Sequence, residues 1–299
     1  MASSSGGKKR DPDWLSLPRD VTLSILSSLG VIDVLMSAQN VCSLWFEICK
    51  DPLIWRTIDM RNLSGDPHLP KRFNLVKMCR CAVDRSRGQL LEVVLDKDVA
   101  SDQLLNYISD RSRWIKRIQI RSCFSLSDEG LIDAFSKFPF LEELDVALCA
   151  FSVIPLVAVG NHCPRLKSLK LNCHLCSAST LDSEGEEEAD EDDAAIAIGR
   201  SMPALHHLQL VGNAMTNLGL KAILDGCPHL ESLDLRQCLN VNLKGVLGER
   251  CSEQIKDLRL PYDLASDYDF LSDDDSDSDD DTDDESLHQD DPSRSSGEE

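Results

Sequence analysis

A short phrase of alternating apolar and polar residues recurs through the second two thirds of the chain. "LEELDVALC" begins at Leu141, and nearly the same phrase, "LESLDLRQC", begins at Leu230. Related phrases begin at residues 90, 115, 166, 205 and 255, in steps of 25 or 26 residues apart from one step of 39. A fixed period of this size over seven units predicts a solenoid of stacked structural repeats.

Each unit predicts one strand and one helix. Leu-x-x-Leu-x-Leu alternates with a period of two, which is typical of a strand with one buried face. Residues 127–138 and 216–227 place apolar side chains at i and i+4, which favours a helix. Neither element can bury its apolar face alone, whereas stacked neighbours can. We therefore expect an α/β solenoid over residues 90–262, with parallel strands on the concave side and helices outside.

The pattern changes to short amphipathic helices in residues 13–60. Pro18 stands at a plausible first helical turn and Gly30 at the end of that helix. Asp33 is placed to cap a second short helix. A third helix follows, and Pro52 ends it; its expected buried face is Val41, Trp45, Ile48 and Cys49. We expect residues 61–89 to form a helical linker or cap before the repeats.

Several cysteines recur at matching positions of the repeats. Cys123, Cys149 and Cys238 follow strands, and Asn213 takes the same position in another unit. "DEGL" and "NLGL" mark the turn into the helix, and "CP" recurs at residues 163–164 and 227–228. These features resemble the cysteine-containing leucine-rich repeat. A small side chain with a weak donor suits a tight corner of such a stack.

The head of the chain resembles an F-box. The family pattern has Leu-Pro, an amphipathic helix, Val-Cys/Ser-x-x-Trp and a final Leu-Trp, and here Ile54 replaces the last leucine. Residues 13 to about 262 together resemble plant F-box/leucine-rich-repeat proteins. The resemblance implies a partner, a Skp-type adaptor that links to a cullin in a ubiquitin ligase. The residues expected to bind it are Leu17, Pro18, Leu26, Leu29, Val41, Cys42, Trp45 and Trp55.

The head has a simpler alternative interpretation. A unit of about fifty residues builds only a small core, and it would leave apolar side chains on its surface, which usually mark an interface. The same leucines and tryptophans could instead be the core of a helical cap on the solenoid. An enzyme inhibitor built on the repeats alone is a related hypothesis, in which the head would be dispensable.

The strand positions between the buried leucines should face outward on the concave side. We expect this surface to hold a protein target, and the alternative is a solvated face whose charges pair across neighbouring strands. The expected target-binding residues are Arg117, Gln119, Arg121, Glu143, Asp145, Lys170, Asn172, His207, Gln209, Asp234 and Arg236.

The net charge of −21 is concentrated in two acidic runs. Residues 263–299 hold 17 acids and one arginine, and residues 179–193 hold nine acids and no base, which leaves about +4 for the rest. We expect both runs, and residues 1–12, to be disordered, because they cannot bury a core. The long run is either a solubilising tail or a lure for a basic partner. It also suggests an alternative function, an acidic-tailed scaffold or histone-binding nuclear protein without a ligase role.

The sequence contains few motifs that are typical of catalysis or metal binding. It has no phosphate-binding loop, no nucleophile elbow and no zinc-protease motif, and "CHLC" (173–176) lacks the second ligand pair of a zinc site. We therefore expect no enzyme activity, no cofactor and no metal, and the acidic tail argues against nucleic-acid binding. With neither a signal peptide nor a membrane span, we expect reduced cysteines and a nuclear or cytoplasmic protein.

Overall fold

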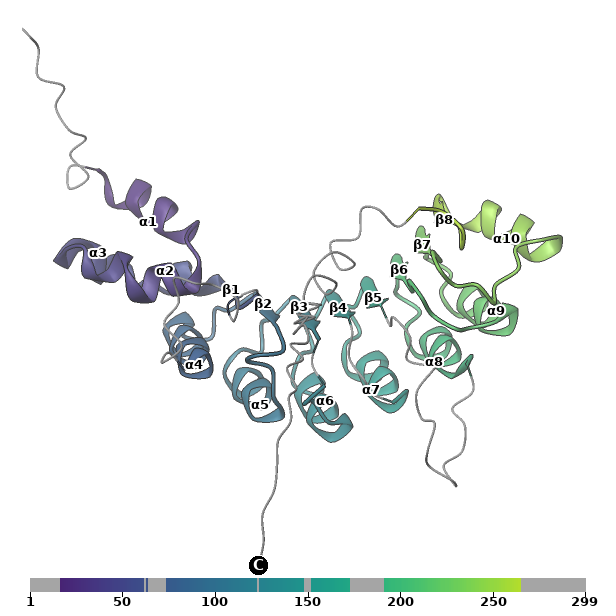
Figure 1. Cartoon of the computed structure of the whole chain (residues 1–299), viewed down its shortest axis with the longest axis horizontal. Helices are drawn as coiled ribbons and strands as arrows, with labels where there is room; N and C mark the ends of the chain where they lie inside the picture. Colours follow the sequence, from purple (N-terminus) through teal and green to yellow (C-terminus); the bar gives the residue numbers. More distant parts are fainter. Residues whose placement is uncertain are drawn as a thin grey trace, which may run out of the picture. The chain divides into compact units, whose positions relative to one another are not determined.

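The computed structural model describes residues 17–61, 63, 74–122, 124–147, 152–172 and 191–264. Its head is a group of short helices (Figure 1). They are α1 (Arg19–Ser27), α2 (Val31–Met36), the 3₁₀ helix η2 (Ala38–Asn40), α3 (Ser43–Ile48) and the 3₁₀ helix η3 (Pro52–Arg56). Gly30 precedes α2 directly, and Asp33 lies inside that helix rather than at its start.

All strands of the described chain form one parallel sheet whose spatial order equals their order in the sequence. Each strand pairs with the next one along the chain, which is the arrangement expected of stacked repeats. The strands are β1 (Thr57–Asp59), β2 (Glu92–Leu95), β3 (Arg117–Arg121), β4 (Glu143–Ala147), β5 (Ser168–Asn172), β6 (His207–Gln209), β7 (Ser232–Asp234) and β8 (Asp257–Arg259).

The helices of the repeats lie on the outer side of the curve and the strands on its inner side (Figure 1). The predicted architecture is therefore confirmed. The buried leucines at the strands fill the layer between sheet and helices. The helices are α4 (Leu75–Ser86), α5 (Asp102–Arg111), α6 (Asp128–Phe135), α7 (Ile154–His162), α8 (Asp193–Ser201), α9 (Asn217–Gly226) and α10 (Val246–Gln254).

The sheet begins earlier than the sequence predicts. Strand β1 lies in the segment assigned to the F-box, and α4 lies in the segment assigned to the linker. Thr57 pairs with Glu92, a spacing of 35 residues that hides this first unit from a search at a period of 25. The head and the repeats thus share one continuous sheet and one core.

Buried cysteines tie neighbouring repeats together. The thiols of Cys238, Cys227 and Cys163 donate to main-chain carbonyls 25 to 28 residues earlier, at S···O distances of 2.8, 3.5 and 3.7 Å. Burial raises the pKa of Cys163 to about 12 and those of Cys227 and Cys238 to about 11. These thiols therefore stay protonated and act as packing groups. Cys123 and Cys149 lie outside the described residues.

The glycine of the turn into each helix has a steric cause. A Cβ atom at Gly219 would lie 2.5 Å from the carboxylate of Asp192, and one at Gly130 would lie 2.2 Å from that of Asp102. Each carboxylate comes from the preceding repeat. Asp192 accepts hydrogen bonds from the main-chain N–H and the hydroxyl of Thr216, both at 2.7 Å. The glycine leaves room for this carboxylate to reach the next helix.

The role of Asp192 corrects one expectation. The sequence places residues 192 and 193 in an acidic insertion, but Asp192 is buried and Asp193 begins α8. Their charge therefore belongs to the repeat scaffold. Residues 173–190, which include "CHLC" and most of that insertion, and residues 1–16 and 265–299 lie outside the described residues.

Candidate docking surfaces

The helical head leaves a set of large apolar side chains in contact with solvent. Their exposed fractions range from 38 to 61%, and all come from the short stretch between α1 and η3. We call them the head apolar surface: Val21, Leu29, Val41, Leu44, Phe46 and Leu53. Such a concentration of exposed apolar residues is typical of a protein interface.

Helix α3 presents two members of this surface, Leu44 and Phe46, and a cap fixes where the helix starts. Cys42 is the N-cap residue, and its sulfur accepts from the main-chain N–H of Trp45 at 3.5 Å. Trp45 packs partly against the core, so Leu44 and Phe46 on either side of it stay outside. The run "SLWFEI" therefore cannot bury all of its apolar residues on one helical face.

Trp55 of η3 anchors the head in the core. Its indole N–H donates to the main-chain carbonyl of Cys49 at 2.9 Å, and the ring is almost fully buried. Arg19 at the start of α1 reaches Asp51 with an N···O distance of 2.7 Å. The hydrogen bond from Arg19 lowers the pKa of Asp51, with a further contribution from the main-chain N–H of Leu53. These contacts hold α1 against η3.

The predicted adaptor-binding residues divide into two groups. Pro18, Leu29 and Val41 are exposed, and three more are half-buried: Leu17, Cys42 and Trp45. Leu26 and Trp55 belong to the core, so the structure corrects their expected role: they support the surface and do not line it. Val41 is also more exposed than its predicted place on a buried helical face implies.

Sequence reasoning missed Val21, Leu44, Phe46 and Leu53 as members of the exposed set. The available signal was a count: the three short helices contain more apolar positions than one buried face can take. Which of them turn outward depends on how α1, α3 and η3 pack on each other. That packing is tertiary information, and the sequence pattern does not specify it.

The inner face of the repeats carries charges that pair across strands. In the row nearest the strand starts, the Arg117 guanidinium lies 3.1 Å from a Glu92 carboxylate oxygen and 3.7 Å from one of Glu143. These three side chains come from β2, β3 and β4 in register. In this part of the sheet, the charges therefore pair across neighbouring strands, as the alternative interpretation of a solvated face expects.

The next row centres on Asp145 of β4. Its carboxylate accepts from the Gln119 amide at 3.1 Å, and the Lys170 ammonium lies 4.0 Å away. Burial raises the pKa of Asp145, and the nearby cations Lys170 and Arg121 partly oppose that effect. The polar side chains around it line a hollow of about 150 Å³ between β2 and β5.

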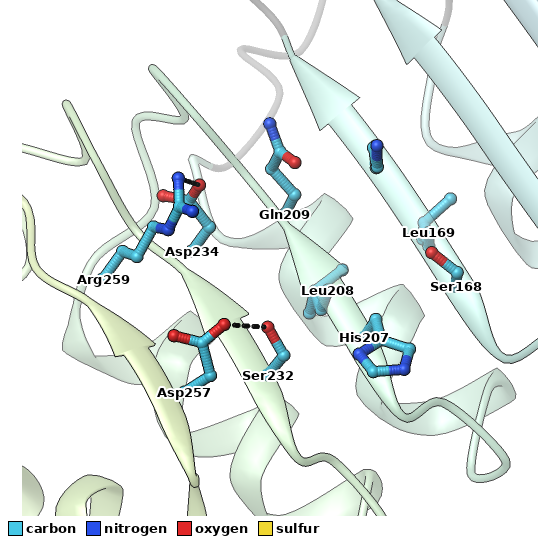
Figure 2. A pocket seen from close by; sticks show the side chains of 10 residues that line it. Ser168, Leu169, His207, Leu208, Gln209, Ser232, Asp234, Asp257 and Arg259 are labelled. Atoms are coloured by element: carbon cyan, nitrogen blue, oxygen red, sulfur yellow. Dashed lines mark hydrogen bonds and ion pairs between the residues drawn. The ribbon is translucent and has the colours of Figure 1, made fainter. Parts of the chain in front are cut away.

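A second hollow of about 270 Å³ lies farther along the same face, over β5 to β8 (Figure 2). The Ser232 hydroxyl donates to Asp257 at 3.3 Å, and Arg259 lies 3.8 Å from Asp234 (Figure 2). His207 and Gln209 of β6 line its other side. The inner face thus offers two small polar depressions.

Eight of the eleven predicted target-binding residues have accessible side chains. Arg117, Glu143, Lys170 and His207 are exposed, and Gln119, Arg121, Asp145 and Gln209 are partly accessible. Asn172 and Arg236 are buried, which corrects the expectation for them, whereas Asp234 is mostly buried but lines the second hollow. Arg236 and Asp234 form a close ion pair within one strand end, with N···O distances of 2.8 to 3.1 Å. That pair explains their burial.

Within the described part of the chain, no three His, Cys, Asp or Glu side chains come together in a way that could hold a metal ion. No helix in the same residues has the length and apolar character needed to cross a bilayer.

Comparison with known proteins supplies independent information. Residues 14–61 match the F-box-like family model, and residues 202–224 match a leucine-rich-repeat model. The chain is 48% identical to F-box/LRR-repeat protein 23 of Arabidopsis thaliana over 85% of this chain and 55% of that protein, or about half of its length. It is 46% identical to F-box/LRR-repeat protein 21 and 44% identical to the F-box protein SKIP19 of the same plant. Those matches cover 84% and 78% of the two proteins and about 85% of this chain.

Proposed function

Because the chain belongs to the F-box/leucine-rich-repeat proteins, we propose that it is the target-binding subunit of a ubiquitin ligase of the Skp–cullin–F-box type. In this proposal the head binds a Skp-type adaptor and the inner face of the repeats binds a protein target. The chain itself catalyses nothing, and the conjugating enzyme supplies the reactive thioester.

The head apolar surface carries the proposal. Six large apolar side chains are exposed between residues 21 and 53, while the leucines of strands β4 to β7 are buried. Leaving such groups in water is unfavourable by ~25 cal/mol per Å² of apolar area. A partner that covers them recovers this free energy, and this is the usual source of affinity at an interface core.

The inner face is the proposed target site. Its exposed polar side chains stand on rigid strands in fixed register, so they present a stable pattern to a partner. Both hollows lie on this face, and both are polar. The target chemistry that fits best is a polar protein segment with charges complementary to Arg117, Glu143 and Lys170.

The mechanism is proximity. One continuous sheet joins the head to the repeats, so a target on the inner face is held at a fixed distance from an adaptor on the head. Holding two reactants together raises their effective concentration and replaces a bimolecular encounter. A rigid scaffold suits this task because its geometry does not have to be re-established in each cycle.

The test is assembly of the complex from purified components. The intact chain is mixed with a Skp-type adaptor, a cullin with its RING subunit and the ubiquitin-conjugation enzymes. The proposal expects co-elution of the chain with the adaptor and adaptor-dependent ubiquitination of the chain or of a bound target. Separate elution of the chain and the adaptor at micromolar concentration would exclude the ligase role.

A further inference from the structure

A strongly basic cleft lies where the head meets the first repeat. It has a volume of about 470 Å³ and is lined by residues from the end of α3 and along α4. We call it the junction cleft: Lys50, Lys77, Arg80, Cys81, Asp84, Arg85 and Arg87. Five cations and one acid line it, a far greater imbalance than on the inner face of the repeats.

The single acid does not neutralise the cleft, because it is engaged elsewhere. The carboxylate of Asp84 accepts from the Tyr107 hydroxyl at 2.6 Å and lies 3.3 Å from the guanidinium of Arg111. Both partners belong to the neighbouring helix α5 and do not line the cleft. Lys50 pairs with Glu47 at 2.8 Å, and in the described part of the chain the other four cations have no carboxylate within ion-pair distance.

Two of these guanidinium groups are held by aromatic rings. Arg80 lies 4.8 Å from the ring centroid of Tyr107, and Arg85 lies 5.4 Å from that of Trp55. The Nε of Arg80 and one Nη of Arg85 are buried without an acceptor among the described residues. A buried donor without an acceptor is costly, so an anionic oxygen in the cleft would lower the free energy of both groups.

The cleft is continuous with the head apolar surface. The ammonium of Lys50 lies 4.0 Å above the ring of Phe46, and Phe46 is a member of that surface. Lys50 therefore borders both the apolar region and the cationic one. A protein that covers Phe46 reaches the mouth of the cleft at the same time.

We infer that the junction cleft receives an acidic segment of the adaptor, so that the adaptor binds through an apolar contact and an electrostatic one together. The inference rests on the proposed function. The apolar part provides most of the affinity, and the acidic segment provides orientation and a faster association. Because the cleft lies on α4 of the first repeat, this second contact fixes the repeats relative to the adaptor, which the head contact alone would do less firmly.

The test compares adaptor affinity at low and high salt. The double variant Lys77→Glu/Arg87→Glu reverses two exposed charges of the cleft, and Lys221→Glu/Lys244→Glu makes the same charge change on exposed residues of the repeats. The cleft variant is expected to bind the adaptor on the order of tenfold more weakly at low salt. It should also lose most of the salt dependence that the wild-type chain shows. The control variant should keep both properties.

Three results would overturn the inference. Equal affinity and equal salt dependence in the cleft and control variants would show that the cleft does not contact the adaptor, while the proposed function would stand. No adaptor binding by the wild-type chain would remove both.

The third result concerns the chain's own acidic run, residues 265–299. If deletion of residues 265–299 strengthens adaptor binding in the wild type but not in the cleft variant, the chain's own tail occupies the cleft.

Discussion

The head and the strands of the repeats differ in how they bury apolar residues. In the repeats, the leucines of β4 to β7 are buried between sheet and helices, and polar side chains pair across the inner face. In the head, Leu44 and Phe46 remain in solvent on α3, a helix only six residues long, and Val41 is exposed just before it. The two regions share one core but present chemically different surfaces.

The difference follows from how each region is built. A repeat gains a neighbour on each side, so stacking covers its apolar faces. Among the described residues, the head has a neighbour on one side only, where β1 and α4 continue the sheet and the helical layer. Its outer face has no following unit, and apolar residues there are useful only if another protein covers them.

The largest expected effect on stability comes from the repeat side. Leu233→Ala removes a fully buried side chain from β7 and should lower the free energy of unfolding by ~2–5 kcal/mol. Val41→Ala in the head should change it by less than ~0.5 kcal/mol, because Val41 is exposed. Urea unfolding followed by circular dichroism measures both. Equal losses in the two variants would contradict the contrast between a buried layer and an exposed surface.

A smaller loss is expected at the turn glycine of α9. Gly219→Ala places a Cβ atom against Asp192, and the overpacking should cost ~1–3 kcal/mol. In the double variant Asp192→Ala/Gly219→Ala the carboxylate is absent. Its loss of stability should therefore be smaller than the sum of the losses in the two single variants. Thermal unfolding of the three variants checks this, and strict additivity would show that the two residues do not interact.

The charges of the inner face should matter less for folding than for binding. Arg117→Glu breaks two ion pairs, but exposed pairs contribute only ~0–1 kcal/mol each. The variant should therefore keep its melting temperature within a few degrees while losing targets that bind at the inner face. Quantitative mass spectrometry of proteins captured by the wild type, by Arg117→Glu and by Lys221→Glu provides the comparison. Identical sets of captured proteins would argue against the inner face as the target site.

The smallest effect is a pH dependence in the head. Asp51 has a lowered pKa in the folded chain, so its ion pair with Arg19 stabilises the fold above the ordinary carboxyl pKa. That contribution is lost as the pH falls through the lowered value. Asp51→Asn should cost ~0.5–1 kcal/mol at pH 7, and the gap to wild type should close below about pH 4. A gap that is constant from pH 7 to pH 3 would show that the charge is irrelevant.

The sequence pattern predicted the repeats better than the head. The period of 25 located β2 to β8 and their helices, because each repeat meets the same local demands. It missed β1, whose spacing of 35 residues breaks the period. The acidic composition of residues 179–193 placed Asp192 in a loop, although its side chain is buried. Leu26 and Trp55 fit the F-box motif as well as Val41 does. A motif marks which residues matter without separating those that support a surface from those that line it.

The central claim is that the exposed apolar residues of the head bind a Skp-type adaptor. Isothermal titration of a purified adaptor into three forms of the intact chain tests it most directly: wild type, Val41→Glu and Val246→Glu. Val246 is a matched control, since it is an exposed valine of α10 in the repeats. The account predicts tight binding by wild type and Val246→Glu, and at least about a hundredfold weaker binding by Val41→Glu, or ~2.7 kcal/mol. Equal affinity in all three would contradict it and place the adaptor contact elsewhere.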